Sequence, residues 1–200
     1  MAIKTFPKTS YKMGKIVVGS ALLVGLSLAT MAYAKNPPLK TVESVELDRY
    51  LGVWYEVARK PLYFQNKCDR DVSATYTLNE NGNVNVDNKC YSKDGKLNQS
   101  IGEAFVQNAP ANSKLKVSFL PSAIRWLPLG RGDYWVLKID ADYRTALVGE
   151  PYQKYLWLLH RDVHLNDDVK AEYLAYAQSL GYQLDDLIHT VHTGRDTAAL

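Results

Sequence analysis

The chain has 200 residues, of which 46% are hydrophobic and 22% are charged. This is enough sequence for one domain with its own core. The formal net charge is +3, but the first 34 residues hold four of the 24 basic residues and none of the 21 acidic ones, so the remainder carries −1. A nearly neutral chain offers no broad positive surface for phosphate backbones, and we expect no nucleic-acid partner.

The first segment has the pattern of a secretory signal peptide. Four lysines and no acidic residue precede an apolar run over residues 16–32, and Ala-Tyr-Ala follows at 32–34 with small residues where a signal peptidase cleaves. We expect residues 1–34 to be removed and the protein to be exported to the periplasm, soluble or loosely associated with the outer membrane. The alternative is an uncleaved anchor, for which the run is slightly shorter than the ~20 residues of a membrane span.

The rest of the chain reads as one domain without internal repeats. Residues 35–42 contain two consecutive prolines and are interpreted as a linker, which places the domain at residues 43–200. Residues 45–50 fit a short helical turn. We find no phosphate-binding loop, nucleophile elbow or zinc motif, and the four histidines show no paired metal-ligand spacing, so we expect neither a metal nor a cofactor.

From residue 54 onward, apolar and polar residues alternate in short runs separated by turn sequences, as in antiparallel strands. After the first run, the others cover residues 72–78, 83–88, 101–106, 114–119, 133–140, 143–150 and 154–161. Eight runs with hairpin-length connections predict a meander. Such a meander either packs as two sheets or closes into a barrel, and closure removes the edge strands.

The hydrophobic period changes after the eighth run. Asn166 and two aspartates form a helix start, and apolar residues then recur at helical spacing until Gly181. We expect a C-terminal helix between these points. Residues 185–191 then fit a final short strand.

Several features, taken in order, resemble the lipocalin family over about residues 43–192. They are the Gly-x-Trp-Tyr stretch at 52–55, the Asp-Ala-Asp-Tyr turn at 140–143, Arg161 at the end of the eighth run, and the C-terminal helix. The stretches WYEVAR and ALVGEP…YLWLL are similar to bacterial lipocalins of the apolipoprotein D-like branch. The resemblance implies an all-β fold, an eight-stranded antiparallel up-and-down β-barrel with one C-terminal α-helix. It also implies a binding protein and not an enzyme.

The same resemblance assigns structural roles to Gly52, Trp54, Asp142, Tyr143 and Arg161. In such barrels one end is closed and a tryptophan plugs it from inside. Trp54 would fill this floor, Gly52 would let the backbone enter tightly, and Arg161 would cover the indole as a cation–π partner. The best-known bacterial members are lipoproteins anchored through an N-terminal cysteine, and this chain has no cysteine near residue 34.

The resemblance also implies a ligand, namely a fatty acid or lysophospholipid stored or transported in the cell envelope. Strand alternation turns a set of aliphatic and aromatic side chains inward, which suits an acyl chain. These are Ala74, Tyr76, Val84, Val86, Val117, Phe119, Tyr134, Val136, Tyr155 and Trp157. The alternative is a barrel filled by its own side chains that acts only through its surface.

Two connecting segments, residues 61–64 and 122–132, are unusually apolar for loops. In a meander they lie at the same end, opposite the Trp54 floor. Two interpretations stay open. The segments fold over each other as a lid, or they form an apolar rim that contacts a membrane or guides lipid inward. The oligomeric state is also open, a homodimer included.

Cys68 and Cys90 flank the first hairpin of a chain that we expect to be exported, which predicts a disulfide. Counting from the turn at 79–82 places Cys68 nearer residue 93, so the pairing needs a bulge or a loop excursion. The alternative is a lipocalin-fold enzyme that acts on a lipid through a free Cys68 thiol.

Overall fold

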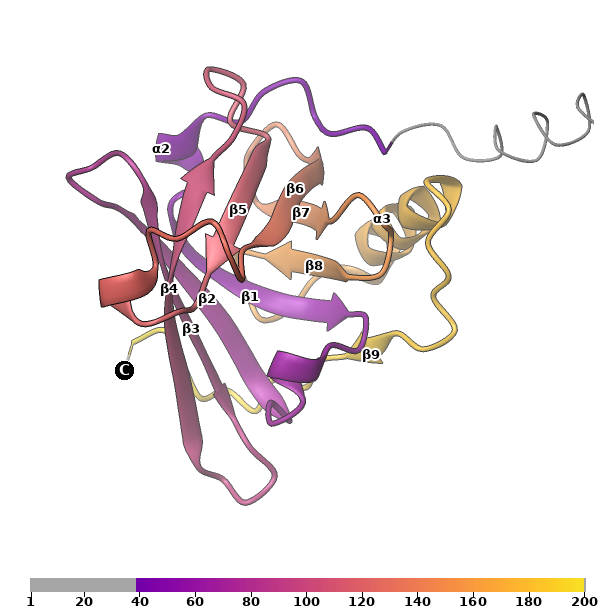
Figure 1. Cartoon of the computed structure of the whole chain (residues 1–200). Coiled ribbons are helices and arrows are strands. Elements are labelled where there is room, and N and C mark those ends of the chain that lie inside the picture. Colours follow the sequence, from indigo (N-terminus) through magenta and orange to yellow (C-terminus); the bar gives the residue numbers. More distant parts are fainter. Residues whose placement is uncertain (1–38, 200) are drawn as a thin grey trace, which may run out of the picture. The chain divides into compact units, whose positions relative to one another are not determined.

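The computed structural model describes residues 39–199 (Figure 1). The expected signal peptide and residues 35–38 of the expected linker lie outside the described residues. Residues 39–42 pack onto the domain, since Leu39 is buried and the backbone N–H of Val42 donates to the carbonyl of Val136 at 2.9 Å. The packed part of the chain therefore begins before the expected boundary at residue 43.

Eight antiparallel strands form a closed barrel, as predicted. They are β1 (Gly52–Arg59), β2 (Arg70–Leu78), β3 (Val84–Tyr91), β4 (Leu97–Val106), β5 (Lys114–Ser118), β6 (Gly132–Ile139), β7 (Thr145–Gly149) and β8 (Leu156–His160). Each strand pairs with the next, and β1 pairs with both β8 and β2. These last two pairings close the sheet, so the main strands leave no long unpaired edge.

The alternation seen in the sequence sorts side chains onto two faces of the sheet. Tyr76 lies opposite Val86, and Val84 lies opposite Ala104. These four side chains point to the same face of the sheet and are buried together inside the barrel. A second hydrophobic cluster lies on the outer face and includes Leu137, Leu147 and Leu158. Burial on both faces explains why β7 is buried along its whole length.

The outer cluster is covered by helix α3 (Asp167–Ser179), which lies beside β6, β7 and β8 in Figure 1. The side chain of Asn166 accepts hydrogen bonds from the backbone N–H groups of Asp168 and Val169, which is the cap that the sequence predicted. Tyr173 and Ala177 form its buried face. The short helix α2 (Leu47–Tyr50) precedes β1, and single 3₁₀ turns occur at Tyr63–Gln65 and Ser122–Ile124.

A β-bulge near the start of β2 shifts the register between β2 and β3. Arg70 pairs with Tyr91, whereas Ser73 pairs with Lys89, and Asp71 between them has a positive φ of 52°. This shift is the bulge that the Cys68–Cys90 pairing required.

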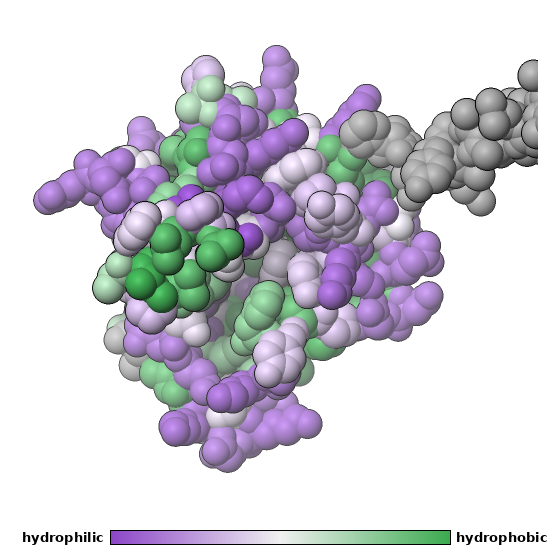
Figure 2. Space-filling view, in the orientation of Figure 1, coloured by the Kyte–Doolittle hydropathy of each residue, from purple (hydrophilic) through white to green (hydrophobic). Residues whose placement is uncertain are grey.

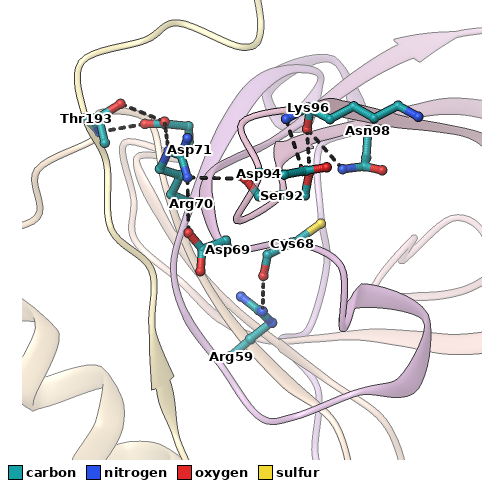
Figure 3. Close-up of polar contacts among 10 residues, drawn as sticks. All are labelled: Arg59, Cys68, Asp69, Arg70, Asp71, Ser92, Asp94, Lys96, Asn98 and Thr193. Carbon is teal, nitrogen blue, oxygen red and sulfur yellow. Dashed lines mark hydrogen bonds and ion pairs between the residues drawn. The ribbon is translucent and has the colours of Figure 1, made fainter.

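The C-terminal segment closes the wall where β1 and β2 separate. β1 pairs with β2 only up to Tyr55, and β9 (Ile188–His189) pairs with β1 beyond that point. Val191 then bridges to Arg70 of β2. The carboxylate of Asp71 accepts hydrogen bonds from the N–H and hydroxyl of Thr193 (Figure 3). The predicted final strand is thus present, and it completes the barrel at one end.

Among residues 39–199, no helix combines the length and the apolar character that crossing a bilayer requires.

Candidate functional site: a cavity inside the barrel

The barrel encloses a cavity of about 810 Å³ that opens at one end. Figure 2 shows this opening as a hollow between two groups of side chains. Val45, Leu47, Tyr50 and Leu51, in and beside helix α2, line the opposite end, so the cavity is closed there. A cavity of this size is within the range of small-ligand sites, and side chains do not fill the interior.

The structure places the predicted inward-facing residues on the cavity wall, with one exception. Ala74, Tyr76, Val84, Val86, Val117, Phe119, Tyr134, Val136 and Trp157 all line it. Tyr155 does not line the cavity, because it precedes β8 and the alternation does not extend to it. Its ring lies instead against those of Phe64 and Trp157, at centroid distances of 6.1 and 6.3 Å.

At the closed end, Trp54 is fully buried beneath the cavity, and Arg161 covers its outer face. The guanidinium carbon lies 3.8 Å from the centre of the indole. The same guanidinium donates to five backbone carbonyls, those of Arg49, Tyr50, Leu51, Val53 and Tyr143. Gly52 begins β1 with a φ of +92°, a conformation that other residues rarely adopt, and a Cβ there would lie 3.4 Å from the guanidinium. The hydrogen bonds of Arg161 thus connect the chain segments that form the floor.

Two residues of the expected motif behave differently from each other. The hydroxyl of Tyr143 accepts a hydrogen bond from the backbone N–H of Glu46 at 2.9 Å, and its ring lies under Arg49. Asp142, by contrast, is exposed and makes no hydrogen bond among the described residues. The carboxylate that holds this turn belongs to Asp140, which accepts from the N–H groups at 144 and 145. The aspartate that stabilises this turn is therefore Asp140 and not the expected Asp142, because only the Asp140 carboxylate faces the free N–H groups of the turn.

Three tyrosine hydroxyls meet on the cavity floor. The hydroxyl of Tyr134 lies 2.7 Å from that of Tyr50 and 3.1 Å from that of Tyr76. Burial raises the pKa of Tyr76 to about 12 and that of Tyr134 well above its usual value. Burial, followed by the neighbouring Tyr76, also raises the pKa of Tyr50. All three phenols stay protonated at neutral pH.

Toward the open end, the wall contains a buried polar network centred on Glu56. One carboxylate oxygen accepts from Arg59 and from the hydroxyl of Thr190, both at 2.5 Å, and the other accepts from the amide of Gln65 at 2.6 Å. The amide oxygen of Gln65 in turn accepts from the indole N–H of Trp157 at 3.3 Å. This network keeps the buried Glu56 carboxylate paired where it lines the cavity.

Asn88 also lines the cavity from β3, between Val86 and Cys90. Its side-chain oxygen is buried and has no hydrogen-bond partner among the described residues. A buried amide oxygen without a partner is costly. Asn88 is therefore a polar contact available to a molecule in the cavity.

Cys68 and Cys90 form a disulfide at the open end, with their Cα atoms 5.4 Å apart. The carbonyl of Cys68 accepts a hydrogen bond from Arg59 at 3.1 Å (Figure 3). This confirms the predicted pairing. In this form Cys68 has no thiolate, so an enzyme that uses it as a nucleophile finds no support.

Both apolar segments lie at the mouth of the cavity. Phe64 and Trp126 expose 73% and 70% of their surface, and Tyr63 and Leu129 are similarly exposed. In Figure 2, hydrophobic surface lies on both sides of the hollow, over the segment after β1 and over the segment between β5 and β6. The two segments leave the mouth open and do not fold over each other as a lid.

Alternation could have found some of the residues that the sequence analysis missed. Glu56 follows Trp54 by two residues, and Asn88 follows Val86 by two, so each shares the inward parity of its neighbour. No such signal existed for Tyr50, which precedes β1, or for Thr190 in the C-terminal segment. Within the described residues, no three His, Cys, Asp or Glu side chains are grouped to hold a metal ion.

Comparison with known proteins agrees with this architecture. The family described as "Lipocalin-like domain" matches residues 45–192, which is most of the chain. The chain belongs to the lipocalin family. Outer membrane lipoprotein Blc of Escherichia coli (strain K12) is 37% identical over 182 residues, which cover 86% of this lipocalin and 98% of the relative. Apolipoprotein D of Bos taurus is 37% identical over 131 residues, which cover 64% and 61%.

Solved structures show the same fold. Insecticyanin from the tobacco hornworm Manduca sexta matches this lipocalin with a TM-score of 0.63 over 80% of the chain and 87% of the insecticyanin. The two share 19% sequence identity, so the likeness concerns the fold alone.

Proposed function

We propose that this lipocalin binds a single-chain lipid, a fatty acid or a lysophospholipid, and stores or carries it in the cell envelope. The observation that carries the proposal is the cavity of about 810 Å³, whose floor and middle are lined by aliphatic and aromatic side chains and whose open end is more polar. The expected signal peptide and the similarity to an outer membrane lipoprotein support a place in the envelope.

The distribution of polar side chains favours one orientation of the ligand. The acyl chain lies along the inner wall, where Val84, Val86 and Val136 are buried. The head group stays at the open end, within reach of polar lining residues such as Asn98 and Ser100. The reverse orientation would bury a charged head without a free cation beside it, which is costly.

An order-of-magnitude affinity follows from the length of the buried chain. About fifteen methylenes gain roughly 12 kcal/mol at ~0.8 kcal/mol each, and association costs at least about 4 kcal/mol. The remaining ~8 kcal/mol corresponds to a dissociation constant near micromolar. Affinity should therefore rise with chain length until the cavity is full, and short acids should bind poorly.

Calorimetric titration with saturated fatty acids and lysophospholipids of increasing chain length tests this proposal. Ala74→Trp fills part of the cavity and should abolish the binding of long chains. Thr75→Trp is its matched control, because the next residue of β2 does not line the cavity. Trp157→Glu places a charge in the wall and should also abolish binding. Affinity that does not depend on chain length, or equal binding by the two β2 variants, would overturn the acyl-chain assignment.

We also propose that the rim of the cavity contacts a membrane surface. The exposed side chains of Phe64, Trp126 and Leu129 supply the apolar contact. Arg125 and Arg131 are basic residues of the segment that carries Trp126 and Leu129. Replacing the first three residues with serine should release the protein from vesicles that contain anionic lipid, measured by flotation. Unchanged flotation would contradict a membrane-binding rim.

A further inference from the structure

The three tyrosines of the floor form a chain of hydrogen bonds with Tyr134 in the middle. Tyr50 and Tyr76 stack with ring centroids 5.9 Å apart, and the ring of Tyr134 stands edge-on to that of Tyr76. All three side chains line the cavity and come from separate parts of the chain, namely helix α2, β2 and β6. Their hydroxyls therefore meet at the inner end of the space proposed for the ligand.

A count of protons shows that this chain of hydrogen bonds is incomplete. Three phenols supply three O–H donors, whereas two hydrogen bonds join them and use two of those donors. One O–H group therefore remains, whichever direction the two bonds run. Among residues 39–199, no other hydrogen-bond acceptor is paired with any of the three hydroxyls. A buried donor without an acceptor is destabilising, and a ligand or a water in the cavity would relieve that cost.

The charge of the floor restricts what the free donor can receive. Arg161 is the cation whose charge acts on Tyr50 and Tyr76, but its N–H groups are bonded to backbone carbonyls on the far side of Trp54. A carboxylate or phosphate at the floor would thus meet neutral phenols and no free cation, and its burial would be costly. A neutral acceptor does not carry this penalty.

We propose that the Tyr50–Tyr134–Tyr76 floor is a subsite for a neutral carbonyl oxygen, of a ketone or an ester, at the end of the ligand farthest from its head group. This inference rests on the proposed function, since it names the lipid class that the same cavity prefers. The ligand then has two polar ends: a head group at the open end and an uncharged carbonyl at the tyrosines.

Two isomeric keto fatty acids test the subsite. They have the same chain length, but one carries the ketone next to its terminal methyl group and the other at mid-chain. Both lose the same hydration on binding, so their affinity ratio isolates the position of the carbonyl. The protein should bind the terminal ketone about three- to tenfold more tightly, as expected for one additional hydrogen bond.

The triple variant Tyr50→Phe, Tyr76→Phe, Tyr134→Phe removes all three donors and should abolish this preference. A single substitution is less informative, because removing one phenol still leaves a free donor on the others. Tyr152→Phe is the matched control: it removes a phenol from an exposed position and should keep the preference. If the triple variant does not fold, the infrared carbonyl band of the bound ketones in the unmodified protein decides. The band of the terminal ketone should lie at lower frequency than that of its isomer.

The outcomes separate the two proposals. If the isomers bind equally and show the same carbonyl band, the floor holds water only, and the subsite is wrong while saturated chains still bind. A preference that persists in the folded triple variant also overturns the subsite. If neither keto acids nor saturated acids bind, the proposed function fails and the subsite fails with it.

Discussion

The closed end and the open end of the barrel use the same residue types in opposite ways. At the closed end, Trp54 is fully buried, and Arg161, which covers the outer face of the Trp54 ring, donates to five backbone carbonyls. At the open end, Trp126 is 70% exposed, and Arg125 donates to the carbonyls of Leu120 and Ile101. Each end thus has a tryptophan and a half-buried arginine bonded to carbonyls, but only the closed end buries its tryptophan.

This difference separates stability from function along the barrel axis. Burial of a large ring stabilises the fold, whereas an exposed ring contributes little to folding and stays available for contact with a ligand or a membrane. Substitutions at the floor should therefore change stability, and the equivalent substitutions at the rim should not.

The largest expected effect comes from truncating the two tryptophans. Trp54→Ala should lose ~3–5 kcal/mol of unfolding free energy, because it leaves a cavity in the core. Trp126→Ala should stay within about 0.5 kcal/mol of the unmodified protein, as exposed substitutions do. Urea unfolding of both variants measures the difference. Similar losses of unfolding free energy in the two variants would contradict the expected difference between floor and rim.

The disulfide is the exception at the open end, where it ties the segment after β1 to β3. Replacing Cys68 and Cys90 together with serine should cost about 3 kcal/mol, because the bond closes a loop of roughly 23 residues in the unfolded chain. The loss should vanish when both proteins are compared in reductant. A double-serine variant as stable as the oxidised protein would show that the open end needs no covalent constraint.

A smaller difference is expected between the two arginines. Arg161→Ala should cost about 2–3 kcal/mol, since it removes the charged cover of the indole and leaves several carbonyls without a donor. Arg125→Ala should cost about 1 kcal/mol or less, because water can reach the carbonyls that it leaves. Thermal unfolding at matched pH compares them. A larger loss for Arg125→Ala would place the stabilising end at the rim.

The smallest effect is a dependence of stability on pH that originates near the floor. His160, at the end of β8, is buried with its Nδ1 3.0 Å from the Thr145 hydroxyl, and burial lowers its pKa below the usual 6.5. The unfolded chain then binds more protons than the folded one, so stability is complete above about pH 6.5 and decreases as the pH falls below that value. His160→Gln should flatten the profile between pH 7 and 5, and His164→Gln should not. Identical slopes in both variants would exclude His160 as the source.

Local pattern in the sequence determined the strands, the helix and most of the cavity wall. Alternation assigns a side chain to one face of a strand whatever its partners are, which is why Val84, Val86 and Val136 were placed correctly. The cap at Asn166 is equally local, since its partners are two and three residues away. The disulfide could be predicted because Cys68 and Cys90 flank one hairpin of a chain expected to be exported, and the roles of Gly52 and Trp54 followed from the resemblance to lipocalins.

Tertiary structure alone decided the features that depend on distant partners. Tyr155 lies just before β8, outside the part of the chain where strand alternation applies, so the sequence pattern could not exclude it from the cavity wall. The geometry of the turn showed that Asp140, and not Asp142, accepts the hydrogen bonds that hold it. On the floor, the hydroxyl of Tyr50 is hydrogen-bonded to that of Tyr134, which is 84 residues away in the sequence. The backbone N–H of Thr193 donates to the carboxylate of Asp71, from which it is separated by 122 residues. A periodic pattern fixes the direction in which a side chain points, but its partner across the barrel is fixed only when strand register and closure bring the two segments together.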